Sequence, residues 1–454
     1  MMTSWQNQDL QQLQITHLEQ LLTRTRTLLA EQGWNRLVIY SGHAHPHFAD
    51  DQSAPHPGYG HFLHWTGLTG LSDSWLEITQ DHPPRLFCYA PEDYWHATPT
   101  LPEGALAQIM RIEPIKARGW PLEQVAEVGS TVVVGDIESL SIPVEKSHCN
   151  PRSFVSALNA LRIHKTAYEA RCTLEASRLA LMGHRAARDA FYQGGSEFDI
   201  HLAWQKGTQQ SESDAPYHSI IGLNEHAGVL HYQHYQNQTP QTLNSLLIDA
   251  GVRYRGYCSD ITRTWAALDQ PRFAALINGL DQLQQKLTQE VKPGVDFVEL
   301  HDKTHQGVAL LLQASGLIKG QITTEAIVET GMTRAFFPHG LGHFLGTQVH
   351  DVGGLETASG QPVPPPQAHP ALRLTHTLEA GMLLTIEPGL YFIDSLLASL
   401  RNGPMSQHLD WSLIEALAPC GGIRIEDNLW VTADGAENLT RASDHGLGVG
   451  QPEV

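Results

Sequence analysis

The sequence predicts a mixed α/β (α+β) protein, with a small N-terminal α/β domain followed by a larger second domain. Two observations support this. In the first third of the chain, helix-like and strand-like stretches alternate. After a long helical stretch that starts near residue 153, short apolar runs return with further helical stretches between them. We place the domain boundary near residue 158, which divides the chain into 1–158 and 159–454.

The elements of the first domain are predicted from apolar patterning. Residues 17–34, "HLEQLLTRTRTLLAEQGW", have the spacing of an amphipathic helix. The runs "RLVIYSG", "RLFCYA" and "TVVVGD" are short, apolar and rich in strand-forming residues. Residues 41–60 are rich in Pro, Gly and His, which indicates a loop.

The second domain begins with one long predicted helix. Residues 156–194 keep apolar side chains at spacings of three and four and end at Gly194-Gly195, a helix stop signal. Further helices are expected at 271–290 and 297–314, and the proline-rich residues 358–376 are expected to form an ordered loop. The predicted strands are "HSIIGL", "SLLIDAG", "ITRTWAAL", "MLLTIEPGLYFI" and "GIRIEDNLWVT".

Composition narrows the class of protein. The formal net charge of −19 disfavours nucleic acids and anionic membrane surfaces as partners. The five cysteines are scattered, without a C-x-x-C pair, so we expect neither disulfides nor a structural zinc. No basic start precedes an apolar run, and no apolar stretch is long enough to span a bilayer. We therefore expect a soluble cytoplasmic protein.

The stretch "HGLGHFLGTQVHD" at 339–351 carries three histidines, two of them four residues apart. A helical zinc-protease motif needs a glutamate directly after the first histidine, and Gly340 stands there instead. Gly340 and Gly342 also disfavour a regular helix. The stretch alone does not decide whether a metal binds, or which histidine would hold it.

Four carboxylates interrupt segments that otherwise favour burial: Asp249, Asp260, Glu387 and Glu426. One such acid by itself is better explained by a salt bridge or a capping role. Unpaired buried carboxylates are costly, and the chain has too few nearby cationic residues to pair each of the four separately. Two divalent ions would balance their charge. With His343 they make an oxygen-rich set suited to Mn²⁺, Co²⁺ or Zn²⁺.

In this order, these residues resemble the five-ligand set of the methionine aminopeptidase and prolidase superfamily. The matching segments are "IDAG", "SDITRT", "HGLGH", "TIEPG" and "IRIED", and "LRIHKTAYEARC" and "LNEHAGVLHY" also look like prolidase segments. The resemblance covers nearly the whole chain and implies a C-terminal pita-bread domain. It implies two divalent ions, most consistent with Mn²⁺, bridged by Asp260 and Glu426. Asp249 would hold one ion, and His343 with Glu387 would complete the other.

The resemblance also implies roles around the ions. His231 would stabilise the tetrahedral intermediate, Glu387 would accept a proton from the attacking water, and His339 would lie just outside the metal ligands. His350 would face the substrate. His231 and His339 each have a plain structural alternative.

Substrate contacts are expected from four residues. Arg424, two positions from Glu426 on a predicted strand, would bind the substrate carboxylate, helped by His350; its alternative is an ion pair with Glu426. Tyr217 would line the pocket, or else be a core tyrosine. Asp50 would meet the free amino group of the substrate, or else cap a turn.

The expected function is therefore a dinuclear metal-dependent dipeptidase, a homodimer that hydrolyses Xaa-Pro dipeptides through a metal-bridging hydroxide. Two alternatives stay open at this stage. One is a broader hydrolase that acts on organophosphorus triesters, since the same hydroxide can attack phosphorus. The other is a metal-free pita-bread protein used only for binding.

Overall fold

The computed structural model describes residues 8–95, 97–119, 130–138, 140, 142, 145–357, 359–443 and 447–450. The chain forms two compact units. The first comprises Met1–Cys172, Tyr254–Tyr257 and Glu356–Pro362, and the second comprises Thr173–Arg253, Cys258–Leu355 and Val363–Val454. The division of the sequence near residue 158 into two domains stays a prediction.

The first unit is built on a five-stranded mixed sheet with the order β4-β3-β2-β1-β5. Leucines on one face of α1, among them Leu18 and Leu29, pack with Leu37 and Ile39 of β1. Its helices and strands are α1 (Leu10–Glu31), β1 (Arg36–Tyr40), α2 (Gly60–Thr66), β2 (Trp75–Thr79), β3 (Arg85–Tyr89), α3 (Ala105–Ile109), β4 (Arg111–Ile115), β5 (Thr131–Val134), the 3₁₀ turn η2 (Lys146–His148) and α5 (Arg152–Ile163).

The single long helix predicted for 156–194 is wrong: the structure has two helices there. The first, α5, ends at Ile163, and α6 (Ala167–Tyr192) starts after a break. The break has a local cause, because the Glu169 carboxylate accepts the Thr166 backbone N–H at 2.8 Å, and the Glu169 N–H points back to the Thr166 hydroxyl at 3.5 Å. This reciprocal pattern is a capping box, which starts a new helix.

The remaining elements follow along the chain. Those of the second unit are α7 (Glu197–Thr208), β6 (Ile220–Leu223), η3 (Asn224–Gly228), β7 (Ser245–Asp249), β10 (Thr262–Ala266), α8 (Pro271–Glu290), α9 (Phe297–Ala314), α10 (Thr324–Glu329), α11 (Met332–Phe336), β11 (Leu383–Ile386), β12 (Gly389–Tyr391), α12 (Asp394–Arg401), η4 (Pro404–His408), α13 (Trp411–Leu417), η5 (Ala418–Cys420), β13 (Gly422–Arg424), β14 (Asp427–Val431), β15 (Ala436–Asn438) and η6 (Arg441–Ser443). The short strands β8 (Arg253–Tyr254) and β9 (Tyr257–Cys258) each have one residue in either unit.

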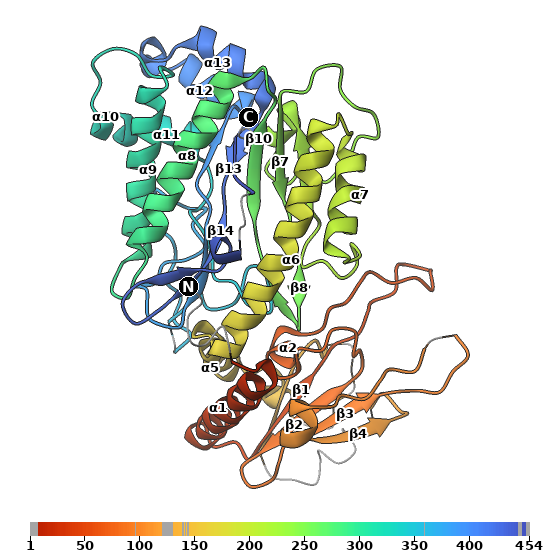
Figure 1. The fold of residues 1–454 in the computed structure, drawn as a ribbon. Coiled ribbons are helices and arrows are strands. Elements are labelled where there is room, and N and C mark those ends of the chain that lie inside the picture. Colours follow the sequence, from red (N-terminus) through yellow and green to blue (C-terminus); the bar gives the residue numbers. More distant parts are fainter. Residues whose placement is uncertain are drawn as a thin grey trace. The chain divides into compact units, whose positions relative to one another are not determined.

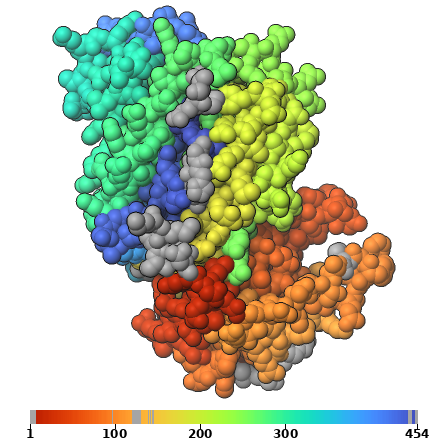
Figure 2. All heavy atoms as spheres, viewed as in Figure 1, coloured from red at the N-terminus to blue at the C-terminus, as the bar shows by residue number. Residues whose placement is uncertain are grey.

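In the second unit, helices cover the strands from two sides (Figure 1). One apolar core joins α8 and α9 to β12 and β13, and a second joins α6 and α7 to β6, β7 and β10. The antiparallel sheets β10-β7-β6 and β11-β14-β15 lie between these helical layers. In the space-filling view these helices form much of the face of the unit that is seen (Figure 2).

The predicted mixed α/β class is confirmed, and most predicted strands and helices are found. The helices expected at 271–290 and 297–314 are α8 and α9. The proline-rich residues 358–376 contain neither helix nor strand where they are described. Among the described residues, no helix combines the length and apolar content that crossing a membrane requires.

Candidate metal centre

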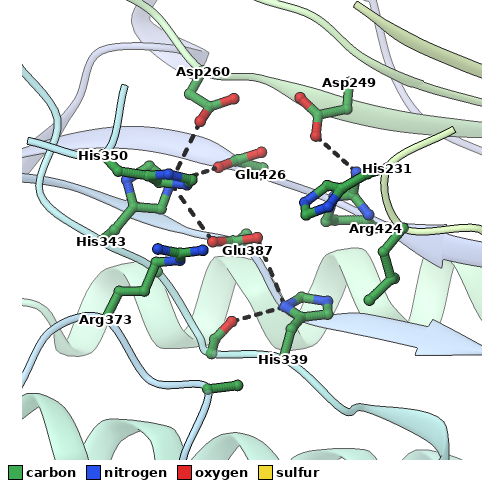
Figure 3. A pocket seen from close by; sticks show the side chains of 14 residues that line it. His231, Asp249, Asp260, His339, His343, His350, Arg373, Glu387, Arg424 and Glu426 are labelled. Atoms are coloured by element: carbon green, nitrogen blue, oxygen red, sulfur yellow. Dashed lines mark hydrogen bonds and ion pairs between the residues drawn. The ribbon is translucent and has the colours of Figure 1, made fainter. Parts of the chain in front are cut away.

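The four predicted carboxylates and His343 line one pocket of the second unit (Figure 3). Each acid lies at or next to the end of a short strand, where the chain leaves a sheet. Asp249 closes β7, Asp260 precedes β10, Glu387 follows β11, and Glu426 stands between β13 and β14. The strands are buried, so their ends carry these charged groups into the interior of the unit.

Asp249 and Asp260 are brought together by the antiparallel pairing of β7 with β10, in which Asp249 lies opposite Thr262. Tyr217 joins the two carboxylates: its hydroxyl lies 2.7 Å from Asp249 Oδ1 and 2.5 Å from Asp260 Oδ1. The hydroxyl has one proton, so it can donate to only one of the two carboxylates at a time. A cation between the acids would compensate the charge that remains. Tyr217 therefore touches two predicted ligands directly.

Residues 339–351 form a loop that runs beside β11. Thr385 N–H donates to the His343 carbonyl at 2.9 Å, and Glu387 N–H donates to the Leu341 carbonyl at 2.8 Å. A Cβ at Gly342 would lie 2.0 Å from the Thr385 carbonyl oxygen, so only glycine permits this approach. The glycine thus allows His343 and Glu387 to face the same pocket.

Glu426 and its neighbour Asp427 point to different partners. Glu426 accepts the Thr262 hydroxyl at 2.7 Å and lines the pocket. Asp427 is fully buried and pairs with Arg263 at 2.8 Å and Arg441 at 2.6 Å, which hold the pKa of its carboxyl well below the usual range against the effect of burial. Only Glu426 is therefore available to an ion in the pocket.

The geometry around His343 fits a divalent cation. Its Nδ1–H donates to the Phe344 carbonyl at 3.0 Å, which leaves the Nε2 lone pair free. This nitrogen lies 3.4 Å from Asp260, 3.8 Å from Glu387 and 4.0 Å from Glu426 oxygens. Metal–ligand bonds of about 2.0–2.2 Å place two ligands of one ion roughly 3–4 Å apart. A proton on His343 would satisfy one of these oxygens, whereas a divalent ion reaches all of them.

Electrostatics also favour bound cations. Burial raises the pKa of Asp249 to about 6, even though Arg424 opposes the shift. Burial likewise raises the pKa of Glu387 to about 7. The pKa of Glu426 is raised well above its usual value by burial and by the charges of Asp260 and Glu387. Burial also opposes ionisation of Asp260, but the hydrogen bond and charge of His343 lower the pKa of its carboxyl. Without cations, the other three acids resist ionisation, so the donor set fits a dinuclear divalent centre.

Arg424 supports the cluster from inside the protein. It is 4% exposed, and its guanidinium donates to Asp249 Oδ2 at 2.7 Å and to the Tyr391 hydroxyl at 2.8 Å. The sequence analysis gave an ion pair with Glu426 as the alternative role of Arg424. In the structure, the Thr262 hydroxyl lies between these two side chains, accepting from Arg424 and donating to Glu426, and Arg424 pairs with Asp249 instead. Its role in holding the substrate carboxylate stays a prediction.

His339 continues the same hydrogen-bond chain. The Tyr391 hydroxyl donates to His339 Nε2 at 2.9 Å, and His339 Nδ1–H donates to the Gly340 carbonyl at 2.8 Å. Burial and the nearby Arg424 charge lower the pKa of His339 to about 3, so its imidazole is neutral. Its Nδ1 lies 3.7 Å from Glu387 Oε2. His339 therefore lies beside Glu387 but makes its hydrogen bonds with Gly340 and Tyr391.

His231 and His350 line the open part of the pocket and are exposed (Figure 3). The His350 ring packs edge-on against His343, with ring centres 4.4 Å apart. Burial and the neighbouring His343 lower the pKa of His350 to about 4. Both histidines are therefore accessible to a molecule bound in the pocket.

Arg373 is a pocket residue that the sequence analysis missed. It is exposed, lines the pocket, and points toward the carboxylates from the proline-rich loop (Figure 3). Among the described residues, its guanidinium has no ion pair. The sequence interpretation treated the segment "ALRLTH" as part of a loop insertion, and a single basic residue in it carried no signal.

Asp50 belongs to the first unit. It is exposed, and its carboxylate accepts the backbone N–H of Gln52 at 3.2 Å, as in a turn. Its predicted contact with a substrate amino group stays a prediction.

Comparisons with known proteins match both parts of the chain. Residues 171–433 match the family model described as Metallopeptidase family M24, and residues 12–160 match that of the Xaa-Pro dipeptidase N-terminal domain. A protein named Xaa-Pro dipeptidase from Marinobacter nauticus is 53% identical over 435 residues, 96% of this chain and 99% of that protein. One of the same name from Salmonella newport is 41% identical over 429 residues, 94% and 97% of the two chains.

Solved structures agree on the fold. Zinc-substituted aminopeptidase P from E. coli, in complex with product, superposes with a TM-score of 0.69 at 22% identity, covering 94% of this chain and 95% of the other. Proline aminopeptidase P II from Yersinia pestis gives 0.67 at 22% identity, covering 95% and 97%.

Proposed function

Because the chain belongs to metallopeptidase family M24, we propose that it is a metal-dependent Xaa-Pro dipeptidase. The observation that carries the proposal is the pocket, in which four acids and His343 meet beside Arg373, an arginine with no ion pair among the described residues. Relatives named Xaa-Pro dipeptidase, similar along nearly the whole chain, support the substrate class. The proposed substrate is a dipeptide with C-terminal proline, cleaved at the bond before the proline.

The pocket suits a small substrate. Its cavity of about 180 Å³ is smaller than the clefts of about 300–1,000 Å³ that hold drug-sized ligands. At its rim, Arg373 can receive a carboxylate in a charge-assisted pair. We place the proline carboxylate there, with His350 nearby; Arg424 lines the other side of the pocket (Figure 3). A third residue after the proline would move the negative charge away from this cation.

The protein's own groups have distinct tasks. Bound divalent ions supply Lewis acidity, which activates water and polarises the scissile carbonyl. Asp249, Asp260, His343, Glu387 and Glu426 hold these ions. His231 donates to the oxygen on which negative charge develops. Glu387 accepts the proton released by the attacking water.

Further assignments complete the proposal. Mn²⁺ is the preferred ion, with Co²⁺ and Zn²⁺ as substitutes, because the donors are mostly oxygens. The active form is a cytoplasmic homodimer of chains with domains 1–158 and 159–454, and Asp50 meets the substrate amino group. Tyr217 lines the site through its contact with Asp249 and Asp260. The comparisons favour neither a phosphotriesterase nor a metal-free binding protein.

The test is a kinetic panel on the purified protein. After removal of bound metal, Ala-Pro hydrolysis should be absent and should return with Mn²⁺. Ala-Pro should be cleaved with a higher kcat/KM than Ala-Pro-Ala and a phosphotriester. A metal-loaded protein that hydrolyses the phosphotriester better than any Xaa-Pro dipeptide contradicts the proposal.

A further inference from the structure

Outside the pocket, three histidines of the second unit come together. His301 and His305 lie one helical turn apart on α9, and His369 lies in the proline-rich loop. One ring nitrogen of each can be chosen so that all three lie within 4.8 Å of one another. Their ring centres are separated by 4.4 to 5.1 Å. The sequence analysis did not identify this group.

Hydrogen bonds to two of the rings resemble the outer contacts of metal-bound histidines. His369 Nε2–H donates to Asp302 Oδ1 at 2.7 Å, which leaves Nδ1 free to coordinate. His305 Nδ1 bonds to the Thr333 hydroxyl at 3.0 Å, which leaves Nε2 free. Metal-ligating histidines commonly use their second nitrogen in this way, and the partner fixes the orientation of the ring.

The third ring has an unsatisfied nitrogen. His301 is 2% exposed, and its Nδ1 is buried with no hydrogen-bond partner in the part of the chain that the structure describes. Leaving such a group unpaired in the interior is unfavourable. Burial and the neighbouring His305 keep the pKa of His301 far below its usual value, so the ring is neutral, as coordination requires.

We propose that His301, His305 and His369 form a separate mononuclear site for a divalent transition metal of the Zn²⁺ class. Three imidazoles suit Zn²⁺, Cu²⁺ or Ni²⁺ better than Mn²⁺ or Mg²⁺. Zinc–nitrogen bonds of about 2.0–2.1 Å at tetrahedral angles place the nitrogens roughly 3.4 Å apart, so the rings have to turn inward by on the order of 1 Å. A water completes the coordination.

This site would connect the loop to the dinuclear pocket. His369 lies on the same loop as Arg373, which lines the pocket. The Phe337 ring packs against His301 and His305, with ring centres 5.5 and 5.2 Å away, and against His339 at 4.8 Å. A metal that ties His369 to α9 therefore anchors the loop that carries Arg373.

The test counts bound Zn²⁺ in the full-length protein by mass spectrometry of the metal after gel filtration from excess Zn²⁺. Wild type should hold three ions. His369→Phe should hold two, and so should His369→Gln, which keeps a polar side chain. Gln367→Ala, an exposed control on the same loop, should hold three.

Asp260→Ala separates this proposal from the proposed function. It removes a predicted ligand of the dinuclear centre and should leave one ion in the three-histidine site. If His369→Phe and His369→Gln bind as much Zn²⁺ as wild type, the three-histidine site is refuted, whatever the activity. If Asp260→Ala holds no Zn²⁺, the independence of the site is also refuted.

Discussion

Replacing Arg373 by methionine should specifically impair the use of substrates with a free carboxylate. The side chain is exposed, and no ion pair in the described residues depends on it, so the variant should fold normally and keep its metals. Arg424→Met is the contrasting variant. It removes the buried partner of Asp249 and should reduce metal content and stability.

The expected loss of activity for each variant depends on whether the arginine is exposed or buried. A charge-assisted hydrogen bond contributes about 1.5–3 kcal/mol, and an exposed pair belongs at the lower end because solvent screens it. About 1.5 kcal/mol corresponds to a loss of roughly tenfold in kcat/KM. Removing one partner of a buried ion pair costs about 3–5 kcal/mol, so Arg424→Met should be the more damaging change.

The assay compares Ala-Pro with its C-terminal amide, in which the scissile bond is intact and only the charge is missing. Wild type should prefer the acid by about tenfold or more, and Arg373→Met should lose that preference mainly through its activity on the acid. Arg424→Met should lower both activities. If Arg373→Met keeps the full preference while Arg424→Met abolishes it, Arg424 receives the carboxylate and the reasoning about Arg373 is wrong.

Three other outcomes are expected. Asp260→Ala should lose both ions of the dinuclear centre, measured as metal content at saturating Mn²⁺; normal metal content and activity would exclude a bridging role. His231→Ala should lower kcat by about 100-fold with little change in KM, since a donor to the developing charge acts in the transition state, whereas an unchanged kcat would leave His231 a structural role. Glu169→Gln should reduce the free energy of unfolding by about 1–3 kcal/mol at pH 7. Burial opposes ionisation of Glu169, but His64, 3.3 Å away, lowers its pKa below 4.5, so the carboxylate stabilises the fold above that pH. This contribution should shrink as the pH falls below about 4.5, and a difference between wild type and variant that stays constant from pH 7 to pH 3 would contradict it.

Strand ends could be predicted well because they combine two signals. A run such as "SLLID" is apolar until its last residue, and a carboxylate there is noticeable because burial makes it costly. Four carboxylates at or near strand ends line one pocket, together with His343 from a loop. Pairing of β7 with β10 supplied the long-range step, which an alternation of short strands and turns already indicates.

Other features depend on local or tertiary detail. The break between α5 and α6 was readable, since Thr166 and Glu169 have capping-box spacing, but continuous apolar periodicity outweighed it. Arg373 and His369 were not predictable, because a loop without periodicity does not show which side chains reach a distant helix or pocket. The contact of Arg424 with Asp249 also depends on tertiary packing, because strand alternation identifies a face and not a partner.

The pairing of Arg424 with Asp249 joins positions 175 residues apart. During synthesis, the first two acids of the pocket leave the ribosome long before Glu426 is made. Until the last strands dock, these early carboxylates have neither their arginine nor the remaining ligands. Tight metal capture therefore comes late, after most of the second unit has been made, and ion binding then favours the completed fold over any partly folded chain.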